Sequence, residues 1–331
     1  MPATKKAAPQ FGPALLRARF VEAATRKFAS NVPDFVRLQE LVRDNGGTFL
    51  NDHGAIRTAD EKVRDLFVRA AGVLGLRREL GYSFPAKKLI SFDLQAIDGK
   101  GGEDHQQFKV FVSQVDLKAF PADVARLIRE DCTEQAAAVD HRGFLALIAR
   151  AERDGGLDDA DATEFVAHFT DRLMARPGPP MKRATLEAVA AVSGEAASAL
   201  ALGPDFNHVT IDVRAAGYQG IEEMAAAMQA RDFRMLPNIQ GAAGTKLRQT
   251  ATLAATMDTP VREADGSNGI APTEKQFVEI IERNQAVDAR GRRLLRKDGQ
   301  PLIFRNFLAA NAEKIFDAAA TRSPGAGRPR A

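Results

Sequence analysis

The stretch ISFDLQAIDGKGGEDHQQFKVFVSQV, residues 90–115, decides the fold class. Apolar and polar residues alternate through its first part: Ile90, Phe92, Leu94 and Ala96 are separated by Ser91, Asp93 and Gln95. This period of two predicts a half-buried β-strand. The loop DGKGGEDH (98–105) then turns the chain, and QQFKVFVSQV (106–115) returns as a second strand. The stretch therefore predicts an antiparallel pair of strands.

The rest of the chain mixes helices with strands. Further strands are predicted over NHVTIDV (207–213), LRQTATLAATM (247–257) and KQFVEIIER (275–283), and the segment 51–58 is predicted to be extended. The spacing of apolar residues predicts helices near 33–43, 59–80, 217–233 and 311–319, with two more within 121–175. Because hairpin-length links join many of these elements, the predicted class is α+β, with a curved, largely antiparallel sheet and surrounding helices.

Proline and glycine mark the predicted domain boundaries. Residues 1–29 are predicted to form a partly flexible N-terminal extension, and residues 30–319 a single domain built from two halves. The segment RPGPP (176–180) is the predicted seam between the halves, because it interrupts any helix or strand. The basic tail at 320–331 is rich in proline, glycine and arginine, which predicts disorder.

Composition excludes several classes of protein. Lysine and arginine total 46 against 43 acidic residues, a net charge of +3, so no nucleic-acid partner is predicted. No apolar run approaches the roughly 20 residues of a membrane-spanning helix, so no membrane partner is predicted. The single cysteine, Cys132, rules out an internal disulfide framework and favours a cytoplasmic location. The oligomeric state is left open.

Two predicted strands carry ionisable residues on faces that should be apolar. In the strand at 207–213, His208 shares a face with Phe206, and in the strand at 275–283 Glu279 and Glu282 lie on opposite faces. At least one glutamate therefore faces an apolar environment, where a carboxylate is costly unless it is neutralised. An arginine would neutralise it, and so would a divalent cation. Two imidazoles and one carboxylate form the facial triad of non-haem iron.

The segment NDHGAIRTAD (51–60) adds a third candidate. It places His53 four residues before Arg57, ahead of a predicted helix. The segment is either a polar turn in solvent, or a site in which His53 holds a metal and Arg57 an acidic substrate. Surface or core roles are predicted for the other histidines, which are His105, His141 and His168. Periodicity alone does not decide between the two interpretations of this segment. It also does not decide whether His208 and Glu279 have structural roles or bind a metal.

Four segments together resemble the 2-oxoadipate dioxygenase/decarboxylase family, also called hydroxyglutarate synthases. They are DHGAIRT (52–58), FNHVTIDV (206–213), LRQTATLAA (247–255) and FVEIIER (277–283), and the resemblance extends from about residue 30 to 318. That family is similar to the vicinal oxygen chelate superfamily, which implies a vicinal oxygen chelate-like sheet around a metal site.

The resemblance also implies roles for particular residues. It implies that His53, His208 and Glu279 bind the metal, and that Arg57 binds a substrate carboxylate. The segment NFLAANAEKIF (306–316) matches a substrate-contacting segment of the family, which implies substrate contacts for Ala310 and Asn311, with His53 also facing the substrate.

The implied activity is that of an Fe(II)-dependent enzyme whose partners are a small-molecule 2-oxo acid and O2. It would convert 2-oxoadipate and O2 into 2-hydroxyglutarate and CO2, a step of lysine breakdown. Two alternatives stay open at this point. One is another metal-dependent vicinal oxygen chelate enzyme, an isomerase or lyase with Zn²⁺, Ni²⁺ or Mn²⁺, and the other is a non-catalytic binding protein.

Overall fold

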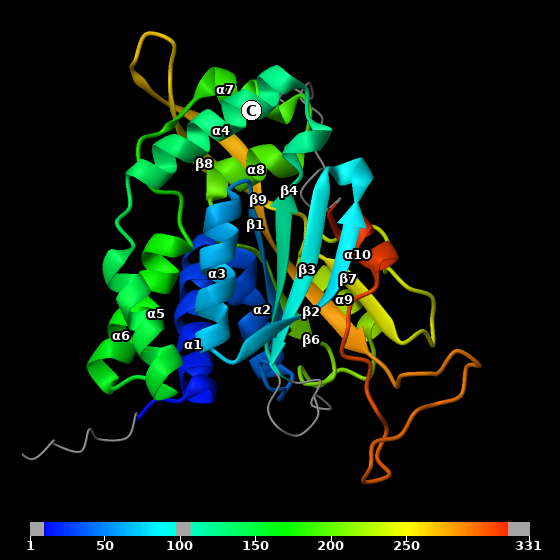
Figure 1. Cartoon of the computed structure of the whole chain (residues 1–331). Helices are drawn as coiled ribbons and strands as arrows, with labels where there is room; N and C mark the ends of the chain where they lie inside the picture. The colour runs from blue at the N-terminus through cyan, green and yellow to red at the C-terminus, as the bar shows by residue number, and fades with distance from the viewer. Residues whose placement is uncertain (1–9, 97–106, 317–331) are drawn as a thin grey trace, which may run out of the picture.

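The computed structural model describes residues 10–96 and 107–316 and contains a curled sheet with helices on both faces (Figure 1). Its α-helices are α1 (Pro13–Asn31), α2 (Pro33–Asp44), α3 (Glu61–Val73), α4 (Ala122–Ala137), α5 (Arg142–Asp154), α6 (Asp159–His168), α7 (Arg183–Ala190), α8 (Gly194–Leu202), α9 (Ile221–Gln229) and α10 (Ala309–Ile315). Its strands are β1 (Asn51–Thr58), β2 (Leu76–Phe84), β3 (Leu89–Ala96), β4 (Lys109–Val115), β5 (Met181–Lys182), β6 (Phe206–Asp212), β7 (Leu247–Ala251), β8 (Ala255–Arg262) and β9 (Asn268–Arg283). The predicted loop 98–105 and tail 320–331 lie outside the described residues. None of the described helices is long and apolar enough to cross a membrane.

The strands form a sheet in the order β2-β3-β4-β1-β6-β9-β8-β5, and β7 also pairs with β9. The antiparallel pair predicted from 90–115 is confirmed, because β3 and β4 pair in register from Leu89↔Val115 to Gln95↔Lys109. Among the described strands, three pairings are parallel, namely β1–β4, β5–β8 and β6–β9, while five are antiparallel. The predicted α+β class with a curved sheet is confirmed, and the sheet is mixed.

The N-terminal segment is a helix of the core. Leu16, Phe20 and Phe28 of α1 are fully buried and belong to one hydrophobic cluster with α2, α3 and one face of the strands. The ring of Phe20 packs edge-on against Phe206 of β6. The predicted flexible extension over 1–29 is therefore wrong from residue 13 onward, because the apolar stripe of α1 covers the sheet.

The helix predicted over 59–80 is a helix followed by a strand. Asp60 caps α3 by accepting hydrogen bonds from the backbone N–H groups of Lys62 and Val63. Shortly after α3 ends, Gly75 has a φ of +75°, a left-handed conformation that favours glycine and ends helices. The chain then enters the edge strand β2, whose middle residues are exposed.

Other predicted elements differ in number or length. The region 121–175 holds α4, α5, α6 and a π-helical turn at Phe169–Leu173 instead of two helices. The strand predicted at 247–257 is divided between β7 and β8, because residues 253 and 254 leave the ladder. The segment 176–180 lies between the π-helical turn and β5, and the division of the domain into two halves there stays a prediction.

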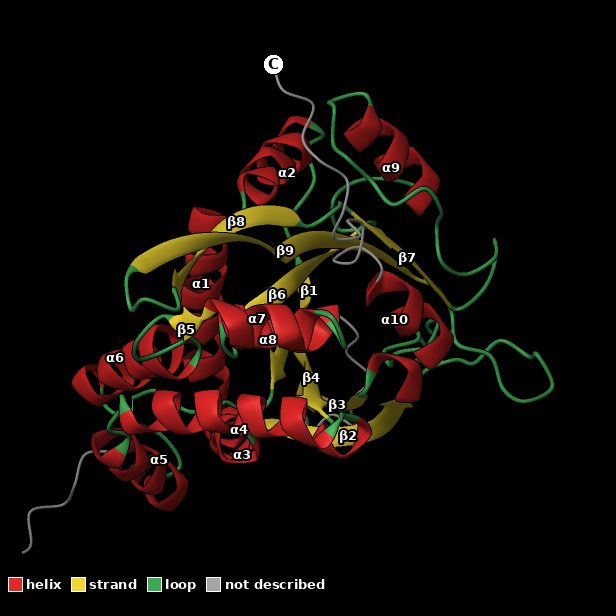
Figure 2. Cartoon of the chain, turned by 90° about the horizontal axis from the view of Figure 1, so that it is seen from above, coloured by secondary structure: helices red, strands yellow, loops and turns green. Residues whose placement is uncertain are grey.

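Both faces of the sheet are covered, which defines an outer and an inner face. Helices α1, α2, α3 and α9 pack on the outer face, while α8 and α10 contact strands from the inner face, around which the sheet curves (Figure 2). Ser91, Asp93 and Gln95 of β3 point inward and are at most 2% exposed. The prediction of a half-buried β3 is therefore wrong, and its polar face lines the protein interior.

Candidate metal centre

Three of the predicted site residues meet on the inner face of the sheet. His53 lies on β1, His208 on β6 and Glu279 on β9, and β6 lies between the other two strands. The strand register places Thr210 opposite both His53 and Glu279. One ligand atom of each of the three side chains lies within 4.8 Å of the others. In the described part of the chain, no other group of three His, Cys, Asp or Glu residues is arranged in this way.

The carboxylate of Glu279 faces both imidazoles. Its Oε2 atom lies 3.4 Å from Nε2 of His208 and 3.9 Å from Nε2 of His53. All three residues are buried, yet Nδ1 of His208 and Oε1 of Glu279 have no hydrogen-bond partner among the described residues. Buried polar atoms are rarely left unpaired, so the unpaired Oε1 atom marks a place beside the Glu279 carboxylate where a further group fits.

The electrostatics of the three residues suit a divalent cation. Burial lowers the pKa of both His53 and His208, so both rings are neutral, the form that binds metals. Burial, together with the nearby charge of Asp52, raises the pKa of Glu279 to about 8. A cation beside Glu279 would reverse this effect by favouring the carboxylate form. Two neutral imidazoles and one carboxylate are the donor set of the non-haem iron triad.

A second layer of residues surrounds His53. Asp52 Oδ1 lies 2.8 Å from Nδ1 of His53, and the same carboxylate binds Arg283 through two contacts of 2.6 and 2.8 Å. The Nζ atom of Lys109 lies 3.4 Å from Oδ2 of Asp52. Burial alone would raise the pKa of Asp52, but Arg283 and Lys109 hold it well below its ordinary value. Asp52 is therefore an anion inside the protein.

The face of β6 that carries His208 differs from the prediction. Phe206 packs with the outer cluster, while His208 points inward and stacks on Phe277, with ring centroids 4.8 Å apart. A register shift in the β1–β6 ladder separates the pairs Ala55↔His208 and Ile56↔Phe206. Because of this irregularity, the shared face predicted for Phe206 and His208 is wrong.

Gly54 allows β1 and the ring of Phe206 to approach closely. A Cβ atom at this position would lie 2.5 Å from the ring of Phe206, which is buried against Phe20 and Phe108. We expect Gly54→Ala to lower the free energy of unfolding by about 1–3 kcal/mol through overpacking, measured by urea denaturation. The control is Gly72→Ala in α3, where nothing lies within 4 Å of the added Cβ atom. This control should be neutral or stabilising by up to about 1 kcal/mol, and an equal loss in both variants would contradict the packing role of Gly54.

Arg57 is buried on β1, on the same face as His53. Its Nη1 atom donates one long hydrogen bond of 3.4 Å to the carbonyl of Glu195, and its Nε atom has no partner among the described residues. The described residues also place no carboxylate within 4 Å of its guanidinium, which lies 5.2 Å from the ring centroid of Phe316. Burial lowers its pKa. Arg57 forms no ion pair with the nearby acidic residues Asp52 and Asp60, because Asp52 binds Arg283 and Asp60 caps α3.

The C-terminal segment contributes a different residue from those predicted. Ala310 is exposed on α10, and the side chain of Asn311 donates to the carbonyl of Leu247, so their substrate contacts stay a prediction. Phe307 instead lies edge-on against His53, with ring centroids 4.8 Å apart. The segment is held by Arg283, which donates to the backbone carbonyls of Phe304 and Asn306.

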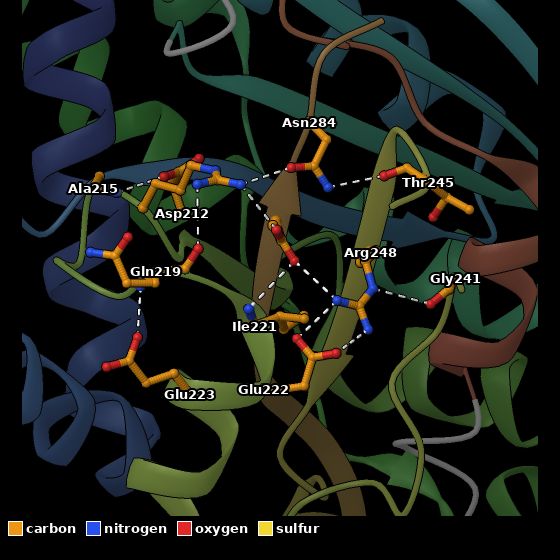
Figure 3. A network of polar contacts seen from close by, with 12 residues as sticks. Asp212, Ala215, Gln219, Ile221, Glu222, Glu223, Gly241, Thr245, Arg248 and Asn284 are labelled. Atoms are coloured by element: carbon orange, nitrogen blue, oxygen red, sulfur yellow. Dashed lines mark hydrogen bonds and ion pairs between the residues drawn. The ribbon is translucent and has the colours of Figure 1, made fainter. Parts of the chain in front are cut away.

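The second glutamate of the last strand faces away from the metal centre. Glu282 is buried on the outer side of β9, where its carboxylate lies 3.1 Å from Arg214 and 3.3 Å from Arg248. Arg248 also binds Glu222 of α9, and Arg214 binds Asn284 (Figure 3). Arginines therefore neutralise Glu282, whereas no arginine of the described residues forms an ion pair with Glu279.

The raised pKa of Glu279 makes a stability prediction for the metal-free protein. The folded protein holds a proton that the unfolded chain releases near pH 4.5, so stability falls as pH rises from there through about 8. Glu279→Gln removes this fall in stability, because glutamine does not ionise. We expect the variant to match the wild type near pH 5 and to be more stable near pH 8.5, by on the order of a few kcal/mol. Melting curves in EDTA at both pH values measure this, and an equal difference at both would contradict it.

Comparison with known proteins assigns the family. A relative from Mycobacterium bovis (strain ATCC BAA-935 / AF2122/97), described as 2-oxoadipate dioxygenase/decarboxylase, is 27% identical over 313 residues, covering 84% of this chain and 72% of the relative. The family model described as 2-oxoadipate dioxygenase/decarboxylase matches residues 17–299. The chain belongs to the 2-oxoadipate dioxygenase/decarboxylase family. It is therefore an enzyme of the class that the resemblance predicted.

Solved structures show the same fold. The hydroxyglutarate synthase from Oryza sativa, solved in complex with 2-oxoadipate, has a TM-score of 0.68 and 18% identity over 97% of both chains. A glyoxalase superfamily protein from Ralstonia eutropha JMP134 has a TM-score of 0.72 and 20% identity, over 86% of this chain and 87% of that one. The vicinal oxygen chelate-like fold is thereby confirmed.

In this member of the 2-oxoadipate dioxygenase/decarboxylase family, several residues around the metal centre had no sequence signal of their own. They are Asp52, Lys109, Thr210, Arg283 and Phe307. Asp52 and Arg283 lie within the motifs DHGAIRT and FVEIIER, at their first and last positions. Their pairing joins residues 231 positions apart, which no local pattern reports.

Proposed function

We propose that this protein is an Fe(II)-dependent dioxygenase/decarboxylase that converts 2-oxoadipate and O2 into 2-hydroxyglutarate and CO2 in lysine breakdown. The observation that carries the proposal is the buried group of His53, His208 and Glu279 on three neighbouring strands. The family membership, and the complex of the Oryza sativa relative with 2-oxoadipate, support the substrate.

The three residues fit an iron ion on chemical grounds. His53 and His208 would supply neutral nitrogen donors and Glu279 one negative oxygen donor, while Oε1 of Glu279 lacks a partner among the described residues. A triad of this composition leaves coordination positions for a 2-oxo acid and O2. The bound metal would supply Lewis-acid chelation of the 2-oxo acid and activation of O2.

The side chain of Arg57 is the candidate partner of the distal carboxylate. A buried guanidinium without a counter-ion is costly, and a substrate carboxylate would remove that cost. Its planar fork can bind both carboxylate oxygens and so fix the orientation of the diacid. His53 and Arg57 share a face of β1 four residues apart, roughly 13 Å along an extended strand. Only the small side chain of Ala55 lies between them on that face.

The reaction balances without an external reductant. The bond between the keto carbon and its carboxyl group breaks, and that carboxyl group leaves as CO2. One oxygen atom of O2 enters the new carboxylate at the former keto carbon, and the other enters a hydroxyl group on the adjacent carbon. The residues of the chain orient the diacid for this change: Arg57 holds the far end, while the neutral histidines and Glu279 define the reacting end.

An oxygen-electrode assay tests the proposal. Metal-free protein is loaded anaerobically with Fe(II), and O2 uptake is followed with a panel of 2-oxo acids. We expect uptake with 2-oxoadipate, with one CO2 and one 2-hydroxyglutarate formed per O2. Loading with Zn²⁺, Ni²⁺ or Mn²⁺ should give no uptake. An isomerase or lyase would transform its substrate with one of these ions and without O2, and a binding protein would show no turnover with any metal.

A further inference from the structure

The carboxylate of Asp52 joins four parts of the protein at one buried point. Its Oδ1 atom contacts Nδ1 of His53 and Nη2 of Arg283, both at 2.8 Å. Its Oδ2 atom contacts Nε of Arg283 at 2.6 Å and Nζ of Lys109 at 3.4 Å. Asp52 and Arg283 are each 1% exposed. Two cations around one carboxylate keep it ionised, so both of its oxygens only accept hydrogen bonds.

This arrangement determines which nitrogen of His53 carries the proton. Because Asp52 only accepts, Nδ1 of His53 must donate, and the neutral ring then has its lone pair on Nε2. Nε2 faces the inner side, where it lies 3.1 Å from the hydroxyl of Thr210 and 3.9 Å from Glu279. A histidine binds a metal through the nitrogen that carries the lone pair, and a carboxylate on its other nitrogen fixes that choice.

Arg283 extends the same arrangement to the C-terminal segment. While Nε and Nη2 bind Asp52, Nη1 donates to the carbonyls of Phe304 at 3.1 Å and Asn306 at 2.9 Å. These bonds hold the backbone next to Phe307, whose ring rests edge-on against His53. A single guanidinium therefore holds both Asp52 and the segment that carries Phe307, the two neighbours of the His53 ring.

We propose that Asp52 and Arg283 are positioning residues of the metal centre: Asp52 sets the proton position and orientation of His53, and Arg283 holds Asp52 and the segment that places Phe307 on the same ring. The proposal deepens the proposed function and rests on it for the identity of the metal. Neither residue is a ligand, and both act through His53.

The substitution Asp52→Asn keeps the shape of the side chain and removes one acceptor. If the amide NH2 replaces Oδ2, it faces the cationic donors of Arg283 and Lys109. If the NH2 group replaces Oδ1, it faces Nη2 of Arg283 and Nδ1 of His53, which are both donors. The conflict with His53 is relieved when the ring moves its proton from Nδ1 to Nε2. With its proton on Nε2, His53 has no lone pair on the nitrogen that faces the metal centre. We therefore expect Fe(II) affinity to fall by about 10–100-fold.

The experiment compares three variants with the wild type. Anaerobic calorimetric titration with Fe(II) gives the affinity, and ¹⁵N-histidine spectra of the metal-free proteins give the proton position on His53. Arg283→Lys is the second test variant, because a lysine cannot bind both oxygens of Asp52 and both carbonyls at once. The matched control is Glu282→Gln, which also breaks a buried pairing between a carboxylate and arginine, on the opposite face of β9.

We expect Asp52→Asn to weaken Fe(II) binding and move the proton of His53 to Nε2, and Arg283→Lys to weaken binding in the same direction. Glu282→Gln should melt at a lower temperature yet bind Fe(II) within about twofold of the wild type, since the described polar contacts of Glu282 are with Arg214, Arg248 and Ile221, outside the metal centre. Wild-type Fe(II) affinity in both Asp52→Asn and Arg283→Lys, with the proton of His53 still on Nδ1, would overturn the positioning role.

If Asp52→Asn does not fold, Arg283→Lys decides the question by the same two measurements. Absence of Fe(II) binding in the wild type would overturn the proposed function, while the ¹⁵N spectra would still decide the role of Asp52.

Discussion

We expect His208→Ala to lose Fe(II)-dependent O2 uptake with 2-oxoadipate while the protein remains folded. The substitution removes one of two neutral nitrogen donors from the three-residue candidate metal centre. A bound metal supplies several kcal/mol of stabilisation to the reaction, so the loss of turnover should be roughly a thousandfold or more. The fold should survive, because the ring of His208 leaves Nδ1 unpaired and its removal abolishes that unfavourable burial.

The control for this prediction is a histidine outside the metal centre. His168 stacks on Phe144, with ring centroids 4.5 Å apart, and forms a hydrogen bond of 2.9 Å with His141. His168→Ala should therefore lower the melting temperature and leave O2 uptake intact. Both variants are compared by O2 uptake, Fe(II) titration and melting curves. Full activity in His208→Ala, or loss of cooperative unfolding in its metal-free form, would assign His208 to the core instead.

The second large effect is expected from Arg57→Met. If Arg57 holds the distal carboxylate, removing it leaves a substrate charge unpaired in a buried site, at a cost of about 2–5 kcal/mol. This corresponds to a loss in kcat/KM of roughly thirtyfold to several thousandfold for 2-oxoadipate. The loss should be small for 2-oxohexanoate, which has the same chain length without the second carboxylate. Arg57→Lys should lie between, because it keeps the charge without the planar fork.

Stability and metal affinity separate this role of Arg57 from a structural one. Apart from a hydrogen bond of 3.4 Å, Arg57 has no polar contact with the described residues, so methionine should leave the melting temperature unchanged or raise it. Fe(II) affinity should stay at the wild-type value, since Arg57 is not a ligand. Equal losses for the diacid and the monoacid, together with a lower melting temperature, would contradict substrate binding by Arg57.

The sequence was sufficient for those features that depend on neighbouring residues. Alternation in 90–115 predicted two paired strands, and apolar spacing predicted α2 at nearly its observed bounds. The resemblance of the motifs to the family also predicted His53, His208 and Glu279 as one group, and the fold brings their ligand atoms within 4.8 Å of one another. Gly75 could have marked the end of α3, but the apolar period continued past it and outweighed that signal.

Only the tertiary structure decided which faces are buried and which charges meet. The period of β3 shows that Ser91, Asp93 and Gln95 share a face, but the curl of the sheet and the elements packed inside it turn that face inward. Likewise, alternation places Glu279 and Glu282 on opposite faces of β9 but does not show which of them has an arginine partner. Glu282 has one because Arg248 lies on its side of β9, whereas the histidines lie on the side of Glu279. Side-chain period is a local property of the backbone, whereas burial and ion pairing depend on the order of strands distant in the chain. For that reason the motifs and their family resemblance predicted His53, His208 and Glu279 as candidate ligands, and the order of β1, β6 and β9 in the sheet determined that Asp52, Arg283 and Phe307 surround them.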